Sequence, residues 1–192
     1  WLGSSTDRWD TSQNKNFGTK EEERTHIVCF AYFEKFYDLL ENFSSYPRAL
    51  RVMALVVRGI HGIFKIKGPC YKSVDISPDE MKSVKEKLII VSQKAWFPNE
   101  YSKLTNKEMV LGSELLNLNP FVDEKGIIRV GGRLANAQDL TYNERFPILL
   151  PSRCRFAYLF ITFLHKITLH GGNQLMLRVL RTEFYVRHAK NL

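Results

Sequence analysis

Apolar side chains recur at intervals of three and four residues between positions 50 and 64, and this spacing constrains the fold more than any other feature of the sequence. Residues at those intervals share one face of an α-helix, whereas a half-buried strand alternates at every second residue. Ser44-Ser45 offers capping hydroxyls, and Pro47 suits a first helical turn. We therefore predict a helix over residues 47–66, with an apolar face made of Leu50, Met53, Ala54, Val57, Ile60, Ile63 and Phe64.

Three further helices are predicted downstream. Residues 77–80 (SPDE) form a capping box, in which the Ser77 hydroxyl accepts from the N–H of Glu80 and the Glu80 carboxylate reaches back. A helix over 77–96 follows from this box. Ser152 is a candidate cap for a helix over 153–166, and Gly171-Gly172 separates that helix from another over 173–184.

One β-hairpin is predicted near residues 116–131. Two β-prone runs flank the turn Asp123-Glu124-Lys125-Gly126, in which Asp123 and Glu124 are interpreted as turn residues. Residues 145–150 are expected to be extended, and residues 26–33 are a possible strand. The expected fold class is α+β, predominantly helical.

The charge is uneven along the chain. The net charge is +8 over 192 residues, and residues 146–192 hold seven basic side chains against one acidic. A basic segment of this kind suggests contact with nucleic acid, DNA in particular; solubility alone is the other interpretation. The candidate contact residues are Arg153, Arg155, Lys166, Arg178, Arg181, Arg187 and Lys190.

Composition also limits the function classes. The longest apolar runs, Val52–Val57 and Phe156–Leu164, are far shorter than the roughly 20 residues of a membrane span, so no membrane partner is expected. Three widely spaced cysteines make neither a disulfide framework nor a CxxC knuckle, which favours a reducing, intracellular location. The chain begins with Trp1 and shows no signal peptide, and we expect it to be a piece of a longer chain.

His165 and His170 form an H-x4-H pair between two predicted helices. A turn can bring two imidazoles to one point and so supply half of a tetrahedral zinc site; a surface pair or a satisfied core histidine is the alternative. Cys154 shares a helix with His165 but lies about 16 Å away along its axis, too far for one zinc ion. His188 could approach only if the chain folds back.

The sequence around these histidines resembles that of a known family. Residues 165–185 read H-x4-H-G-G-x4-L-x2-L-R-x2-F-Y, which is similar to the start of the His-His-Cys-Cys zinc-binding domain of retroelement integrases. Residues 118–134 (LNPFVDEKGIIRVGGRL) and 146–151 (FPILLP) resemble the segment before that domain in Pol polyproteins of BEL/Pao-type LTR retrotransposons. Residues 43–46 and 50–58, and Trp1-Leu2, match the same family.

The resemblance implies three regions: a polar arm with a possible strand over 1–45, a helical connector with the hairpin over 46–145, and the first half of the zinc domain over 146–192. It also implies that His165 and His170 are zinc ligands in the intact parent. The family's C-x2-C pair is absent from these 192 residues, as are the three carboxylates of the integrase core, and Arg187 stands where the family has proline. We therefore expect this chain by itself to be essentially metal-free at ordinary zinc concentrations and to catalyse no reaction.

Two other function classes remain open. The segment could be a domesticated, non-enzymatic nucleic-acid-binding or interaction module, or a pseudogene-derived segment without function. No nucleophile–base pair and no phosphate loop is recognisable, so neither an enzyme nor a small-molecule substrate is predicted. The expected partners are DNA and the rest of the polyprotein, including the integrase core.

Overall fold

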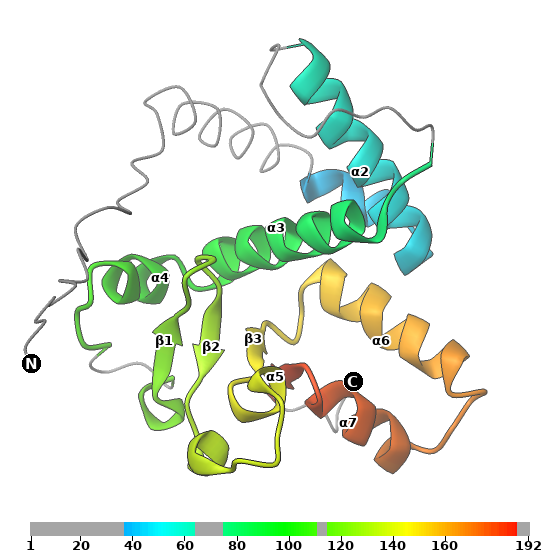
Figure 1. Ribbon diagram of the computed structural model, residues 1–192. Coiled ribbons are helices and arrows are strands. Elements are labelled where there is room, and N and C mark those ends of the chain that lie inside the picture. Colours follow the sequence, from blue (N-terminus) through cyan, green and yellow to red (C-terminus); the bar gives the residue numbers. More distant parts are fainter. Residues whose placement is uncertain (1–36, 64–74, 111–114, 188–192) are drawn as a thin grey trace, which may run out of the picture.

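The computed structural model describes residues 37–63, 75–110 and 115–187 (Figure 1). The helices are α2 (Tyr46–Ile63), α3 (Pro78–Trp96), α4 (Pro98–Thr105), α5 (Tyr142–Arg145), α6 (Arg155–Ile167) and α7 (Asn173–Arg181). Short 3-10 turns occupy Asp38–Asn42, Leu116–Leu118 and Arg133–Asn136. The strands are β1 (Pro120–Val122), β2 (Ile128–Val130), β3 (Ile148–Leu150) and β4 (Phe184–Val186). The fold is α+β and mostly helical, as predicted.

The four short strands form one sheet in the order β1-β2-β3-β4. β1 and β2 are antiparallel, with Phe121 opposite Arg129, and β2 and β3 are antiparallel through Arg129 and Ile148. β3 and β4 are parallel, and the chain between them forms α6 and α7. The segment that holds the histidine pair is therefore a helical crossover between two neighbouring strands.

Helix α3 connects the two halves of the fold. It contacts α2 on one side and β3 and α6 on the other, and in Figure 1 it crosses the middle of the molecule. Its buried residue Gln93 bonds directly to the sheet: Nε2 donates to the carbonyls of Ile128 (2.9 Å) and Leu149 (2.6 Å), and Oε1 accepts from the N–H of Ile128 (2.8 Å). One side-chain amide thus bridges β2 and β3.

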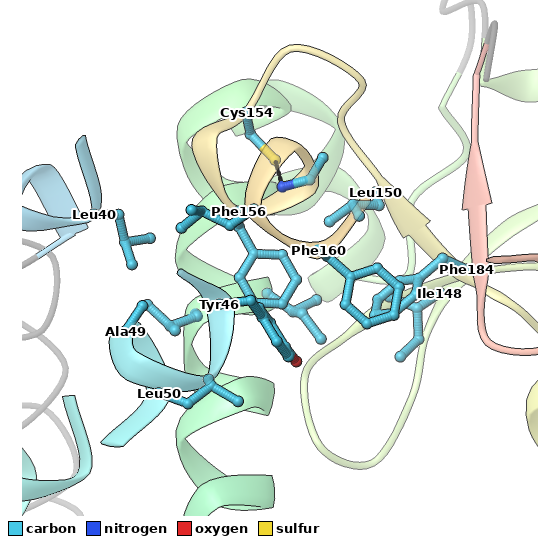
Figure 2. Close-up of a cluster of buried hydrophobic side chains, with 14 of the residues drawn as sticks. Leu40, Tyr46, Ala49, Leu50, Ile148, Leu150, Cys154, Phe156, Phe160 and Phe184 are labelled. Atoms are coloured by element: carbon cyan, nitrogen blue, oxygen red, sulfur yellow. Dashed lines mark hydrogen bonds between the residues drawn. The ribbon is translucent and has the colours of Figure 1, made fainter. Parts of the chain in front are cut away.

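The main core lies between α2, α3, α6 and β4. Tyr46 meets Phe160 edge-to-face at 5.3 Å between ring centroids, and Phe160 meets Phe184 at 4.9 Å. Figure 2 shows these rings together with Phe156, and Phe184 is fully buried. Such aromatic contacts add to the free energy gained by burying apolar area. The core unites residues of the expected connector with residues of the expected zinc domain.

The predicted helices agree with the structure except at some ends. Ser77 caps α3 with both bonds of the predicted capping box. The helix expected over 153–166 begins at Arg155, and its cap is the buried sulfur of Cys154, which accepts from the N–H of Ala157, rather than Ser152. Residues 152 and 153 turn the chain out of β3 instead. Residues beyond Ile63 of the first helix lie outside the described part of the chain.

Two predictions along the chain need correction. The helix expected over 173–184 ends at Arg181, because Phe184 pairs with Ile148 as part of β4. The hairpin expected near 116–131 starts only at Pro120, because the preceding 3-10 turn ends at Asn119 in a left-handed conformation with φ 44°. Helix α4, which begins at Pro98 just after α3 ends, was not predicted. The possible strand over 26–33 and most of the polar arm lie outside the described residues.

Candidate metal half-site and basic surface

The turn between α6 and α7 brings His165 and His170 together. The Thr168 hydroxyl donates to the Leu164 carbonyl (2.9 Å) where α6 ends, and the N–H of His170 donates to the His165 carbonyl (3.0 Å). Leu169 and His170 both take left-handed conformations, with φ of 51° and 61°. Such angles are uncommon for residues with a side chain, and here they turn the chain back toward α6.

The two imidazole rings converge on one point. Nε2 of His165 lies 2.8 Å from Nδ1 of His170, with the ring centroids 4.6 Å apart and the planes at 75°. Two nitrogens bound to one zinc ion at about 2.0–2.1 Å each lie about 3.3 Å apart in a tetrahedral site, so a small separation of the rings makes room for the ion. His165 is half-buried and His170 is exposed, so the point is open to solvent. The pair suits two of four zinc positions.

Gly171 allows the turn to close tightly. A Cβ atom built on it would lie 2.8 Å from Cδ2 of Leu175 and 3.1 Å from the carbonyl oxygen of Thr168. The backbone contact leaves no easy relief for a larger residue. Glycine at the first position of the Gly171-Gly172 pair therefore has a steric reason, which the family resemblance alone did not provide.

Met176 is a neighbour that the sequence analysis did not identify. Its Sδ lies 3.4 Å from Nδ1 of His165, on the opposite side of the ring from His170. Met176 occupies the first turn of α7, which begins at Asn173. Its position six residues after His170 could have suggested contact, but no spacing rule indicates which ring nitrogen it meets.

No further metal ligand joins the pair within the part of the chain that the structure describes. No group of three or more His, Cys, Asp or Glu side chains there could hold a metal ion. Cys154 is buried at the opposite end of α6 from His165, where burial raises the pKa of its thiol. Its sulfur belongs to the helix cap, so the exclusion of Cys154 from a shared zinc site agrees with its position. His188, Cys29 and Cys70 lie outside the described residues.

The predicted basic contact residues divide into two groups. Arg153, Lys166, Arg178 and Arg181 are exposed. Arg155 is instead built into the fold: its guanidinium donates to the carbonyls of Phe43 (2.6 Å) and Leu40 (3.4 Å) and lies 5.0 Å above the ring of Tyr158. Arg155 therefore fixes the segment before α2 onto α6. Arg187 is half-buried and has a partner, and Lys190 lies outside the described residues.

The exposed basic residues occur in a segment without acidic side chains. No Asp or Glu lies between Glu144 and Glu183, while the same span contains six cations: Arg145, Arg153, Arg155, Lys166, Arg178 and Arg181. Arg178 and Arg181 stand three residues apart on α7 and so project on the same side of the helix. No carboxylate of this span offsets their field, which favours contact with a polyanion.

A cleft of about 830 Å³, which no sequence feature predicted, lies between α3, the β1–β2 hairpin and α5. Its lining combines aliphatic side chains with three ion pairs, whose N···O distances are 2.6 Å, namely Lys85–Glu183, Lys125–Glu86 and Arg129–Asp123. Asp123 also accepts from the N–H groups of Lys125 and Ile127. This carboxylate closes the hairpin turn as predicted, and its pairing argues against a catalytic role.

No helix in the described ranges combines the length and apolar character needed to cross a membrane. Comparison with protein-family models, with curated proteins and with solved structures gave no match to this chain.

Proposed function

We propose that this chain is a segment of a BEL/Pao-like Pol polyprotein that carries half of an integrase zinc-binding domain, and that it contacts nucleic acid without catalysing a reaction. The convergence of Nε2 of His165 and Nδ1 of His170 at 2.8 Å supports the proposal most directly. These are the two residues that the resemblance assigns as zinc ligands.

The role proposed for zinc is structural. His165 lies in the last turn of α6, and His170 directly precedes the glycine pair that leads into α7, so one ion held by both would tie the two helices together. Four protein ligands are usual in structural zinc sites, and the second pair in the family is two cysteines. With two imidazoles alone, water fills the remaining positions, and zinc affinity is expected to be low.

Zinc titration of the metal-free chain tests this part of the proposal. Weak 1:1 binding is expected, and it should be lost in His165→Ala and in His170→Ala. His61→Ala, a change in a half-buried histidine on α2, is the matched control and should leave binding unchanged. A longer chain that includes the family's cysteine pair should bind many-fold more tightly. Equal affinity of the short and long chains would contradict the half-site.

The nucleic-acid part of the proposal rests on the exposed cations of α7. Arg178 and Arg181 lie in the span between Glu144 and Glu183, which contains no acidic side chain. Contacts from exposed cations to phosphates give salt-dependent, sequence-tolerant binding. The competing function, a surface that only docks on an integrase core, predicts no such binding. Fluorescence anisotropy with a duplex of arbitrary sequence, measured over a series of salt concentrations, separates the two.

The double variant Arg178→Gln/Arg181→Gln should weaken duplex binding and reduce the slope of log affinity against log salt by up to about 2. Arg48→Gln/Arg51→Gln is the matched control, because these two arginines are also exposed and also three residues apart on a helix. Equal losses in both double variants would show a general charge effect. No loss in the α7 variant would contradict the proposed interface.

A further inference from the structure

The two ring nitrogens of His165 face two different groups. Nδ1 lies 3.4 Å from Sδ of Met176, and Nε2 lies 2.8 Å from Nδ1 of His170. Both His165 and Met176 are half-buried, so the ring is held between α7 and the turn. A histidine with contacts at both nitrogens has its proton placed by the chemistry of its neighbours.

A thioether sulfur can accept a hydrogen bond but has no proton to donate. A neutral imidazole carries one N–H, so the contact with Met176 is a hydrogen bond only when Nδ1 of His165 holds that proton. Nε2 then has a free lone pair. The single proton between Nε2 and the neighbouring ring must therefore be supplied by Nδ1 of His170.

We propose that Met176 is a positioning residue that holds His165 in its Nδ1–H tautomer and so presents Nε2 as the metal-binding nitrogen. This inference rests on the proposed function, since it names the residue that prepares the first ligand. Metal-binding histidines usually donate their second N–H to a carboxylate or a carbonyl, which fixes the tautomer and the ring orientation. Here a sulfur on the first turn of α7 takes that place.

The two histidines then differ in the proton movement that metal binding would require. Nε2 of His165 would hold a metal ion without any proton movement at that ring. For Nδ1 of His170 to become a ligand atom, that ring would have to release the Nδ1 proton to water and take one up from water at Nε2, which leaves the ring neutral. His170 is exposed, so water can reach both nitrogens. His165 would thus serve as a ligand without a change of tautomer, whereas His170 would have to give up its hydrogen bond to Nε2 of His165.

Long-range ¹H–¹⁵N spectra of the metal-free 192-residue chain, taken well above the usual imidazole pKa, test the tautomer directly. His165 should show the Nδ1–H form. In Met176→Leu, which keeps the apolar bulk but removes the acceptor, the Nε2–H form should become populated, and zinc affinity should fall about 10- to 100-fold. Met176→Gln, whose amide oxygen can accept from Nδ1, should restore the Nδ1–H form.

Met109→Leu is the matched control, because Met109 is 77 % exposed and distant in sequence from the turn. An Nε2–H tautomer of His165 in the unsubstituted chain, or an unchanged tautomer in Met176→Leu, would overturn the inference. The two proposals fail separately. If the tautomer is as expected but the chain binds no zinc, the proposed zinc role is wrong and the positioning by Met176 stands.

Discussion

Replacement of Gln93 by leucine should destabilise this fold more than its small change in volume suggests. The side chain is fully buried and makes three hydrogen bonds to the main chain of β2 and β3, at 2.6–2.9 Å. Between β2 and β3, only Arg129 and Ile148 are paired. The side-chain amide of Gln93 therefore supplies much of the hydrogen bonding that joins these two strands.

Gln93→Leu leaves two carbonyls and one N–H without these partners in the interior. Each such group costs about 1–3 kcal/mol, which gives at least about 3 kcal/mol for the three. Burial of leucine in place of an amide offsets about 1–2 kcal/mol. The net loss of at least about 1–2 kcal/mol is a sizeable share of the roughly 5–15 kcal/mol typical of a folded domain.

Urea unfolding followed by circular dichroism measures this loss as a lower midpoint at unchanged slope. Gln138→Leu is the matched control, because Gln138 is exposed, and it should change the free energy of unfolding by no more than about 0.5 kcal/mol. Gln93→Glu adds a second test, since a carboxylate cannot donate to the two carbonyls. A Gln93→Leu chain as stable as the control would refute the bridging role.

Three further outcomes are expected. The Arg58 guanidinium bonds both carboxylate oxygens of Glu80 and lowers the pKa of that carboxyl to about 2. The pair therefore stabilises the fold above the unfolded pKa near 4.5 and loses this effect as the pH falls toward 2, so Glu80→Gln should flatten the pH dependence of the urea midpoint in that window. Phe184→Ala should cost about 3–5 kcal/mol in the same assay, because the ring is fully buried against other aromatic rings; a loss below 1 kcal/mol would contradict the packing described. Arg129→Met should cost about 3–5 kcal/mol by leaving the buried Asp123 carboxylate without its cation, and pairing this change with Asp123→Asn should recover part of the loss.

The sequence alone predicted the elements whose cause is local. The helical spacing of apolar residues located α2, and the Ser77–Glu80 capping box located the start of α3, because these patterns act between residues three and four apart. The turn at Asp123 was predicted for the same reason. The histidine pair was also found from sequence, since its spacing and the family resemblance point to one turn.

Tertiary structure decided what depends on residues far apart in the chain. Phe184 continues the apolar spacing of α7, yet it lies in a strand because β3 offers hydrogen-bond partners that no local pattern reveals. Arg155 looked like a surface cation, but carbonyls more than a hundred residues earlier bind it. The packing of α7 on α6 determines that Nδ1 of His165 faces the sulfur of Met176 while Nε2 faces His170. Spacing along the sequence indicates which residues can meet, whereas only the packing of the helices determines which atoms do.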